Sequence, residues 1–305
     1  MRFARIVMLD FEERDFAPEE WRELRSLGHE LDRCRSSDPE LPARLAQADC
    51  LLVQLGVALT AERLAAAPEL RYVGVFGTST GRIGALAPGV VLRNVPGFST
   101  EAVAEFAVAV VLEHLRGLAA ARARGALGDF SEPAQPGSEL GGRRWAVLGL
   151  GAIGRRVAEI AGHGFGARVR CWSRTPRPEL GFPRRELDAL LPDAEILSVH
   201  VALTDETRGL LDAERIARMA EGALLVHLAP PELLDVPALL RRVQARELHF
   251  VTDHADEMDP RAVAALTESE ACTLYPPIGY ATREARAARR ARFPGDLRAF
   301  VDSAR

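Results

Sequence analysis

The sequence contains no lysine, and all 39 of its basic residues are arginine. Without a lysine amine the protein cannot form a Schiff base, so lysine-anchored pyridoxal phosphate chemistry is excluded. A Walker P-loop is excluded as well, because that motif uses a lysine to hold the phosphates of its nucleotide. The abundance of arginine and alanine indicates coding bias, so the arginines as a group carry no functional inference.

Cysteine is scarce, and several other features are missing. The four cysteines are far apart and form no CxxC pair, which favours reduced thiols, a cytoplasmic location and no metal site. No apolar run approaches the roughly 18 residues of a membrane span, and the start of the chain does not resemble a secretory signal. The net charge of −4, with scattered basic residues, predicts no nucleic-acid partner.

What the sequence does contain is two series of alternating strands and helices. In the first, strands are expected at 6–9, 29–31, 50–54, 72–76 and 90–95, and helices at 18–27, 41–48 and 60–67, the last with Thr60 as its N-cap. In the second, strands are expected at 145–148, 168–172, 195–201, 223–228 and 249–252, and helices at 153–162, 184–190, 212–219, 236–245 and 259–266. Repeated strand–helix units predict parallel sheets covered by helices on both faces, which is an α/β fold.

Three segments lie outside those series. A long helix is expected over 99–120 with Ser99 as its N-cap, and its apolar face is wider than one packing partner needs. Residues 121–141 are rich in glycine, proline and serine and are expected to form a loop. A last helix is expected over 282–302, with Pro294 interrupting it.

Residues 145–154, Trp-Ala-Val-Leu-Gly-Leu-Gly-Ala-Ile-Gly, carry the strongest functional signal. Four apolar residues predict a buried strand, which is followed by glycines with GxGxxG spacing: Gly149, Gly151 and Gly154. In a dinucleotide-binding turn the first glycine makes the tight turn, the second admits the pyrophosphate, and the third lets the helix pack on the strand. The N–H groups at the start of the helix, at Ala152 and Ile153, then face the phosphates. The alternative is a glycine-tolerant turn with an empty pocket.

The end of the next strand bears on the choice of cofactor. A unit that prefers NAD has an acidic residue there for the ribose 2′-OH, whereas an arginine suits the 2′-phosphate of NADP. Strand 168–172 is followed by Ser173, Arg174 and Thr175, with no acid. Because a hydroxyl and a guanidinium suit a phosphate, NADP(H) is favoured over NAD(H). The alternative is that Arg174 is a solvated side chain in an arginine-rich sequence.

With these features, the sequence resembles the D-isomer-specific 2-hydroxyacid dehydrogenases, and among them the NADP-dependent glyoxylate and hydroxypyruvate reductases. The similarity runs from about residue 50 to residue 284. The segments that carry it are 48–53 with 59–60, 70–73, 77–78, 94–97 with 103–105, 140–142, 149–154, 200–204 with 206–210, and 278–282. Ala202 stands where the family usually has a proline.

The resemblance implies two doubly wound parallel-sheet domains, a flavodoxin-like substrate domain and an inserted Rossmann dinucleotide-binding domain. The first would comprise residues 1–97 and 285–305, and the second residues 98–284. The family is usually dimeric through the helix at 99–120, so a homodimer is implied. The resemblance also implies further cofactor contacts at Val201, Ala202, Thr207, Leu228 and Asp253, and substrate contacts at Phe76, Gly77 and Thr78.

The three catalytic positions of the family do not carry the family's residues in this chain. The family uses an arginine to hold the substrate carboxylate, a histidine to exchange the hydroxyl proton, and a glutamate to tune that histidine. The matching residues are Pro230, Pro277 and Met258, and a one-residue shift would replace the last by Asp259. Proline has no side-chain donor or base and methionine does not titrate, so the ordinary 2-hydroxy acid reaction is expected to be nearly absent.

His227 and His254 are the candidates to take over acid–base catalysis. His227 is expected at a strand end near the cofactor, and His254 follows Asp253, an acid that could orient it. The alternative for each is a packed or solvated side chain. Two functions remain open. One is a divergent NADP(H)-dependent oxidoreductase that does not act on ordinary 2-hydroxy acids. The other is a catalytically inactive pseudoenzyme that acts as a nucleotide sensor or as a partner of another protein.

Overall fold

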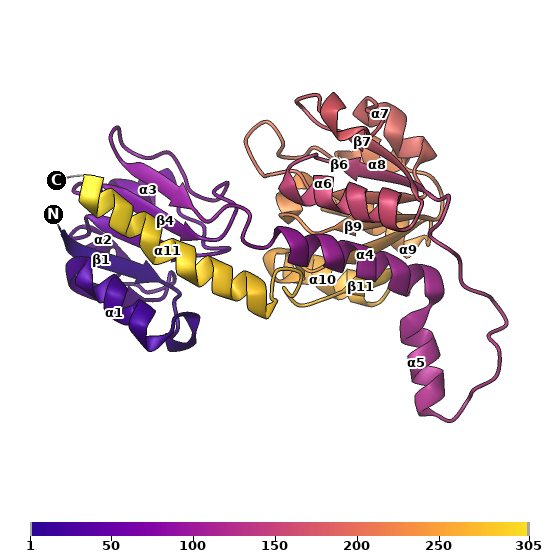
Figure 1. The fold of residues 1–305 in the computed structure, drawn as a ribbon, viewed down its shortest axis with the longest axis horizontal. Helices are drawn as coiled ribbons and strands as arrows, with labels where there is room; N and C mark the ends of the chain where they lie inside the picture. The colour runs from indigo at the N-terminus through magenta and orange to yellow at the C-terminus, as the bar shows by residue number, and fades with distance from the viewer. Residues whose placement is uncertain (1, 304–305) are drawn as a thin grey trace. The chain divides into compact units, whose positions relative to one another are not determined.

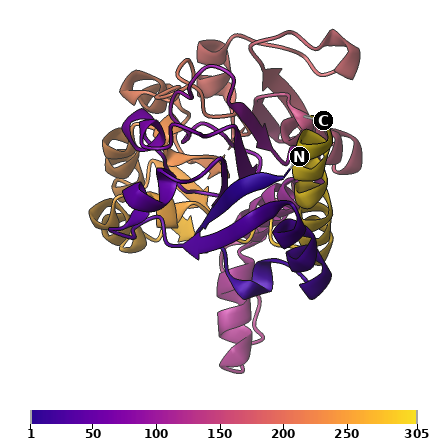
Figure 2. The same ribbon diagram turned by 90° about the vertical axis from the view of Figure 1, so that its left-hand side faces the viewer.

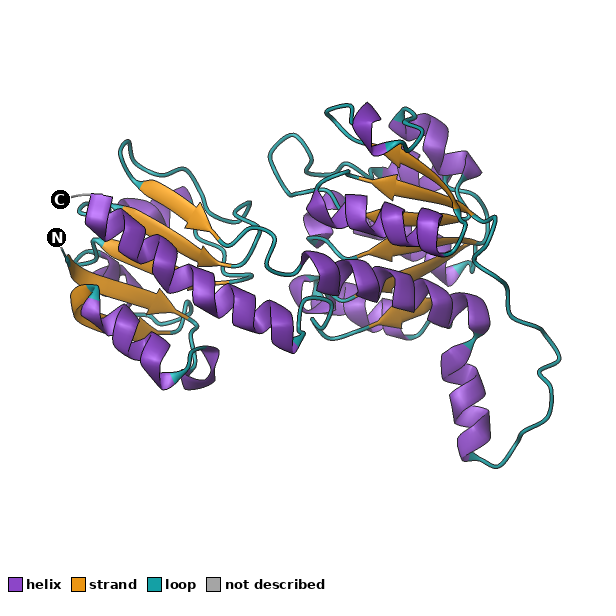
Figure 3. Cartoon of the chain, in the orientation of Figure 1, coloured by secondary structure: helices purple, strands orange, loops and turns teal. Residues whose placement is uncertain are grey.

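The computed structural model describes residues 2–303, and the chain folds into two compact units. Unit 1 contains the chain up to Phe98 and again from Arg283, and unit 2 contains Ser99–Thr282. Each unit is a parallel sheet flanked by helices (Figure 1, Figure 3). The predicted α/β fold with two doubly wound sheets is therefore confirmed. Within residues 2–303, no helix combines the length and the apolar character that crossing a membrane requires.

Unit 1 is built around a five-stranded sheet in the order β2-β1-β3-β4-β5, the flavodoxin-like order. The strands are β1 (Phe3–Leu9), β2 (Gly28–Cys34), β3 (Cys50–Gln54), β4 (Tyr72–Phe76) and β5 (Val91–Asn94). The helices are α1 (Pro18–Ser26), α2 (Leu41–Leu45), α3 (Ala61–Ala65) and α11 (Arg283–Ser303), with a 3-10 turn at Glu13–Asp15. β3 and β4 are almost wholly buried, which explains their unbroken apolar sequences.

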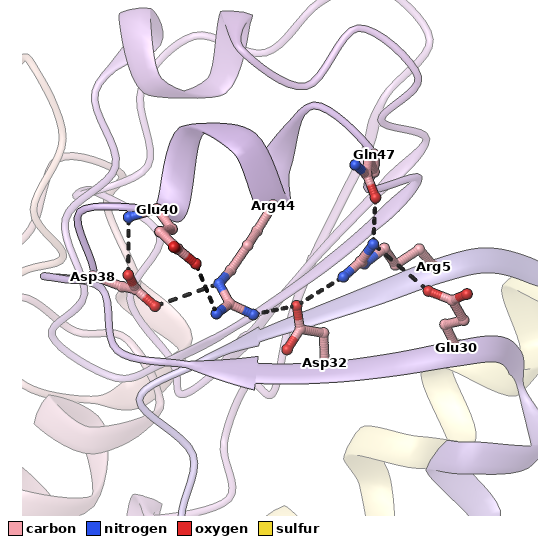
Figure 4. Close-up of polar contacts among 7 residues, drawn as sticks. All are labelled: Arg5, Glu30, Asp32, Asp38, Glu40, Arg44 and Gln47. Carbon is pink, nitrogen blue, oxygen red and sulfur yellow. Dashed lines mark hydrogen bonds and ion pairs between the residues drawn. The ribbon is translucent and has the colours of Figure 1, made fainter.

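A polar network ties α2 to the edge of this sheet (Figure 4). Asp32 on β2 accepts hydrogen bonds from Arg5 on β1 at 3.1 Å and from Arg44 on α2 at 2.7 Å. Burial works to raise the pKa of Asp32, but the hydrogen bonds and charges of the two arginines outweigh it and lower that pKa. The network therefore anchors a helix of only five residues, which is too short to be stable alone.

Unit 2 contains a six-stranded sheet in the order β11-β10-β9-β8-β6-β7. The strands are β6 (Arg144–Leu148), β7 (Arg168–Trp172), β8 (Ile196–Val199), β9 (Ala223–His227), β10 (Leu248–Thr252) and β11 (Cys272–Leu274), and every neighbouring pair is parallel. The chain runs outward from β6 to β7 and then returns to β8. The carboxyl ends of β6 and β8 therefore form a topological switch point, where open α/β sheets bind ligands.

The helices of unit 2 cover both faces of this sheet. They are α4 (Thr100–Arg116), α5 (Leu118–Ala126), α6 (Ala152–Glu159), α7 (Leu187–Leu190), α8 (Ala213–Arg218), α9 (Val236–Gln244) and α10 (Pro260–Thr267), with 3-10 turns at Pro178–Leu180, Leu191–Asp193, Pro231–Leu233 and Ala255–Glu257. Side chains of β6 alternate between the two layers. Trp145 and Val147 pack with α4 and α6, whereas Ala146 and Leu148 pack with α7, α8 and α9. This alternation follows from the two-residue period of a strand.

The helix expected over 99–120 is in fact two helices, so that prediction is wrong in its extent. Gly117 adopts a φ of 59° and caps the end of α4 in the left-handed conformation, which glycine accepts without steric cost. α5 then continues to Ala126, so the expected loop over 121–141 begins later. Ser99 occupies the N-cap position, but its side chain makes no capping hydrogen bond. The capping prediction holds at Thr60, whose hydroxyl accepts from the Arg63 N–H.

The prediction that Pro294 interrupts the last helix is also wrong. α11 runs unbroken from Arg283 to Ser303 with Pro294 inside it. A proline removes one backbone hydrogen bond, but the helix buries Phe293, Leu297 and Val301. Packing of that apolar stripe outweighs the local loss, because tertiary burial provides most of the stability of helices in proteins.

Several other boundaries differ from the expected ones. The strand expected at 29–31 extends over β2 because its polar residues pair with β1 at the sheet edge. The helices expected at 41–48 and 184–190 shorten to α2 and α7, and α6 ends at Glu159 before a π-turn over Ile160–Gly164. β11 was not expected, because three residues at a sheet edge give little periodic signal.

Candidate functional site

The glycine turn has the geometry that the sequence predicts. β6 ends at Leu148, Gly149 adopts a φ of +92°, and Gly151 immediately precedes α6. A Cβ on Gly149 would lie 2.6 Å from the carbonyl oxygen of His200, and a Cβ on Gly154 would lie 1.8 Å from the carbonyl oxygen of Gly149. The first and third glycines are therefore required by the tight turn and by the packing of α6 on β6.

The second glycine has a different environment. Gly151 is exposed, and a Cβ built on it would have no other atom within 4 Å. The next residue, Ala152, begins α6 and is also exposed, and Ile153 is half-buried. Open space in front of a helix N-terminus, at a topological switch point, is what an anionic ligand such as a pyrophosphate requires.

The residues after β7 lie together in one short turn. The Ser173 hydroxyl donates to the carbonyl oxygen of Thr175 at 2.6 Å, so this side chain shapes the turn. Arg174 is 71% exposed and forms an ion pair with Glu206. The guanidinium therefore faces solvent beside a carboxylate, which sequence reasoning did not anticipate because Glu206 comes from a distant loop.

The loop after β8 contains three more of the predicted cofactor residues. Thr207 is buried, and its hydroxyl donates to the Ala202 carbonyl at 2.7 Å and accepts from the Thr204 N–H at 2.8 Å. Thr207 thus holds the loop in shape. Val201 is half-buried and Ala202 exposed at the rim, while Leu228, just after β9, is buried in the core beside α4 and α6.

Three side chains near the carboxyl ends of β8, β9 and β10 have buried polar atoms without a hydrogen-bond partner among residues 2–303. These atoms are Nδ1 and Nε2 of His200, Nε2 of His227 and Oδ1 of Asp253. Burial lowers the pKa of His200 to about 4. Burial, together with the charges of His254 and His200, lowers the pKa of His227 to about 3. Unsatisfied polar atoms gathered at one sheet edge are expected where a polar ligand or ordered water binds.

Asp253 is held at the end of β10 by the segment that contains Gly279. Its Oδ2 accepts from the Gly279 N–H at 2.8 Å, and a Cβ on Gly279 would lie 2.7 Å from that oxygen. Burial raises the pKa of Asp253, although the charge of His254 and the hydrogen bond from Gly279 oppose this rise. The remaining oxygen, Oδ1, is an oriented acceptor that the protein leaves open.

His254 lies between two carboxylates. Its Nδ1 is 3.2 Å from Glu257 and its Nε2 is 3.7 Å from Oδ1 of Asp253. Burial favours the neutral imidazole, but the hydrogen bond with Glu257 and the charges of Asp253, Glu257 and Asp256 outweigh burial and raise the pKa of His254. At 22% side-chain exposure, His254 is the more accessible of the two histidines that the sequence proposed.

The three positions that the sequence resemblance aligned with the family's catalytic residues have side chains without an acid, a base or a guanidinium. Pro230 follows β9 and begins the turn Pro231–Leu233. Met258 packs against the apolar core on the α8–α10 side of the sheet, and Pro277 is half-buried. Asp259, the alternative at the Met258 position, caps α10 by accepting from the Arg261 N–H at 2.8 Å.

The predicted substrate residues lie in unit 1, after β4. Phe76 and Gly77 are buried and Thr78 is exposed. Sequence reasoning missed Arg289 on α11, which is 8% exposed. Its guanidinium carbon lies 4.0 Å from the centre of the Phe76 ring, and its Nη1 donates to the Phe76 carbonyl at 3.3 Å. No sequence signal distinguishes this arginine from its many neighbours on α11.

Comparison with known sequences points to one family. Residues 108–279 match the profile of the D-isomer specific 2-hydroxyacid dehydrogenase, NAD binding domain. A glyoxylate reductase of Aeropyrum pernix is 32% identical over 261 residues, which cover 81% of this chain and 78% of that protein. A D-3-phosphoglycerate dehydrogenase of Mycobacterium leprae is 33% identical over 254 residues, covering 81% of this chain but 48% of that protein. The chain thus spans about half the length of the phosphoglycerate dehydrogenases that it matches.

Solved structures with the same fold were also found. The D-lactate dehydrogenase of Aquifex aeolicus, complexed with NAD and lactic acid, superimposes with a TM-score of 0.87 at 24% identity, covering 98% of this chain and 96% of that chain. The TT0316 protein of Thermus thermophilus has a TM-score of 0.82 at 27% identity, covering 99% and 97%. The protein therefore belongs to the D-isomer-specific 2-hydroxyacid dehydrogenase family and carries its NAD-binding domain.

Proposed function

We propose that this protein is an NADP(H)-dependent oxidoreductase whose substrate is not an ordinary 2-hydroxy acid. The observation that carries the proposal is the turn from Gly149 to Gly154. Gly149 and Gly154 are fixed by contacts within the protein, whereas Gly151 faces open space. A turn kept only for packing has no need of a glycine at that second position, and a turn that admits a pyrophosphate does.

The residues present fit a nicotinamide dinucleotide. The start of α6, at Ala152 and Ile153, would offer backbone N–H groups to the pyrophosphate. At the other end of the site, Oδ1 of Asp253 is a buried acceptor without a hydrogen-bond partner among residues 2–303, and it suits the N–H donors of a nicotinamide carboxamide. A nicotinamide bound there would supply or accept a hydride.

The preference for NADP(H) rests on Arg174. A guanidinium at the end of β7 gives a phosphate a charge-assisted, bidentate contact, and Ser173 and Thr175 shape the turn that presents it. The ion pair between Arg174 and Glu206 weakens the expected preference for NADP(H). A 2′-phosphate bound to Arg174 either displaces the Glu206 carboxylate or is repelled by it. We therefore expect only a moderate preference for NADP(H) over NAD(H).

Arg174→Ala is expected to weaken NADPH binding about tenfold or more and to change NADH binding little, because only NADPH carries the 2′-phosphate. Glu206→Gln should strengthen NADPH binding, because it removes the carboxylate that pairs with the Arg174 guanidinium. Arg177→Ala is the matched control, because Arg177 is an exposed arginine three residues further along. Fluorescence titrations with both cofactors measure these changes. Equal losses of NADPH and NADH affinity in Arg174→Ala would contradict the assignment.

The nature of the substrate follows from what the site lacks. Pro230 cannot hold a carboxylate, and Pro277 and Met258 cannot exchange or tune a proton. A free 2-oxo carboxylate would therefore bind without its clamp and react without the family's acid. The proposed substrate carries a carbonyl or imine group but does not depend on a carboxylate held at Pro230.

The experiment that tests this function is a screen of NADPH oxidation against 2-oxo acids, aldehydes and imines. Imines belong in the screen because an acyclic imino acid reductase, solved with NADPH and D-Arg, shares the fold with a TM-score of 0.83 at 20% identity. Turnover of an aldehyde or imine would support the proposal. Tight NADPH binding without turnover of any compound would favour the second candidate, a pseudoenzyme that senses a nucleotide or binds another protein, which the three catalytic replacements motivate.

We further propose that the protein is a homodimer, as the family resemblance implies. The wide apolar face of α4 is mostly buried within unit 2. The exposed apolar side chains lie beyond it, on α5 and the following turn: Leu118, Leu127 and Phe130 are 51%, 87% and 87% exposed. α5 projects from the body of unit 2 (Figure 1, Figure 2).

The tip of this projection is held by hydrogen bonds. Arg124 donates to Asp129 and to Ser131, each at 2.8 Å. Exposed apolar groups on an ordered projection are typical of an interface.

Replacing Leu127 and Phe130 together by serine is expected to convert the dimer to a monomer, because the interface loses its apolar contacts. Sedimentation velocity measures the change, with Arg122→Gln on the exposed surface of α5 as the control. A wild-type protein that sediments as a monomer, or a double variant that stays dimeric, would contradict the proposed interface. The cytoplasmic location remains a prediction.

A further inference from the structure

The proposed function requires a group that gives or takes the substrate proton, and Pro277 cannot supply it. The titratable side chains next to the carboxyl ends of the central strands β8, β9 and β10 include His200, His227, Asp253 and His254. His227 is 1% exposed and its pKa is lowered to about 3. Both ring nitrogens of His200 are buried, and burial lowers its pKa to about 4. Both histidines are therefore neutral near pH 7, and neither presents an accessible protonated nitrogen.

His254 differs from these neighbours in how it is held. Glu257 lies 3.2 Å from its Nδ1 and fixes the ring from one side. The other ring nitrogen, Nε2, makes no hydrogen bond to a carboxylate. It lies 3.7 Å from Oδ1 of Asp253, which is beyond hydrogen-bond distance. The backbone is fixed as well, because the His254 N–H donates to the Thr252 hydroxyl at 3.0 Å. A histidine oriented by a carboxylate at one nitrogen presents the other to a reacting group.

Asp253 links His254 to the reacting centre. Its Oδ1 is the open acceptor that suits the carboxamide of a nicotinamide, and it is the same atom that lies 3.7 Å from Nε2 of His254. A substrate that accepts a hydride would lie against the nicotinamide ring, so we place it on the side of the site where Oδ1 of Asp253 and Nε2 of His254 meet.

We propose, resting on the proposed oxidoreductase function, that His254 is the proton donor of the reduction and that Glu257 is its positioning residue. A bound nicotinamide would supply a hydride to the carbon of a C=O or C=N group. As that C–H bond forms, the π electron pair moves to the oxygen or nitrogen, which takes the proton from Nε2 of His254. The Nε2–H bond breaks, and His254 becomes a neutral imidazole that keeps its contact with Glu257. Solvent at its exposed edge then returns the proton.

The charges around His254 set the pH dependence of this step. Asp253, Asp256 and Glu257 face it from its own loop, and His227 faces it from β9. His227 is neutral near pH 7, so the carboxylates dominate and keep His254 protonated to a higher pH than an ordinary histidine. The rate of reduction should therefore be highest at low pH and fall as the pH rises through the pKa of His254.

The experiment compares wild type, His254→Gln and Glu257→Gln with the carbonyl or imine compound that the wild type reduces. His254→Gln should lower kcat by about 10²-fold or more with KM and NADPH affinity nearly unchanged. Glu257→Gln should shift the descending limb of the kcat–pH profile to lower pH, because His254 loses its main stabilising partner. NMR titration of the imidazole resonances, which needs no turnover, should give the same downward shift of the His254 pKa.

Asp256→Asn is the matched control, since it removes the same charge from the same loop but makes no hydrogen bond to the ring. Its charge contributes less to the raised pKa of His254 than Glu257 does, so its profile should shift to lower pH by less than that of Glu257→Gln. A His254→Gln variant that keeps the wild-type kcat and pH profile would overturn this proposal alone and leave the oxidoreductase function standing. A rise in KM without loss of kcat would assign His254 to substrate binding instead and overturn it as well. A wild type that binds NADPH but reduces no compound overturns both proposals together.

Discussion

Gly151→Ala is expected to weaken the binding of NADPH and NADH by roughly 10–200-fold, the usual effect of one misplaced methyl in a fitted site. The added Cβ would meet no other protein atom within 4 Å, so it intrudes only on the space that we assign to the pyrophosphate. The φ of Gly151 is −70°, which alanine adopts readily. Alanine is a somewhat poorer helix cap than glycine, so the melting temperature should fall by no more than about 3 °C.

Gly154→Ala is the matched control for Gly151→Ala, because it adds the same methyl group at another position of the same turn. Its Cβ would lie 1.8 Å from the Gly149 carbonyl oxygen, a contact that forces α6 away from β6. Overpacking of this kind costs about 1–3 kcal/mol or more, or roughly 2–4 °C of melting temperature for each kcal/mol. Thermal denaturation and cofactor titration of both variants separate the two effects. A Gly151→Ala protein that binds NADPH as tightly as the wild type would contradict the proposed site.

Reduction of glyoxylate, hydroxypyruvate and pyruvate by the wild type is expected to be about 10⁴-fold or more below that of an active relative in kcat/KM. The loss of acid–base assistance is commonly worth about 10²–10⁴-fold, and the loss of the carboxylate clamp that we infer at Pro230 adds to it. His254 does not restore that assistance for these compounds, because a 2-oxo acid without its carboxylate contact is not held where the imidazole can protonate it.

The comparison should be made side by side with the glyoxylate reductase of Aeropyrum pernix, which is 32% identical to this chain. NADPH and NADH are both tested, so that a different cofactor preference is not mistaken for inactivity. If this protein reduces 2-oxo acids within tenfold of that enzyme, residues other than Pro230 hold the carboxylate, and the proposed substrate class is wrong.

Much of the fold was predictable because the local signals agree with the tertiary structure. The apolar runs at Cys50–Gln54 and Tyr72–Phe76 are central strands buried on both faces. Predictions failed where long-range packing decides the outcome. Pro294 is tolerated because α11 buries an apolar stripe, and α4 ends at Gly117 because a left-handed residue suits glycine. A single glycine in an apolar helical pattern does not reveal which conformation it adopts.

The candidate site was predictable in part for the same reason. The glycine spacing predicts a turn, and the turn has the expected contacts at Gly149 and Gly154. The sequence cannot reveal pairings between distant segments, such as Arg174 with Glu206 or Asp253 with the Gly279 N–H. The sequence also could not show which of His227 and His254 is the better candidate for acid–base catalysis, because the two differ in burial, which only the structure reveals. His227 is enclosed, whereas His254 is oriented by Glu257 and partly exposed.

The measurement that tests the central claim most directly is a titration of the purified wild type with NADPH and with NADH. Binding is followed by quenching of tryptophan fluorescence and by the fluorescence of the nicotinamide. We expect saturable NADPH binding in the micromolar range and weaker NADH binding. Binding of neither nucleotide would contradict the claim that the Gly149–Gly154 turn and Asp253 form a working dinucleotide site.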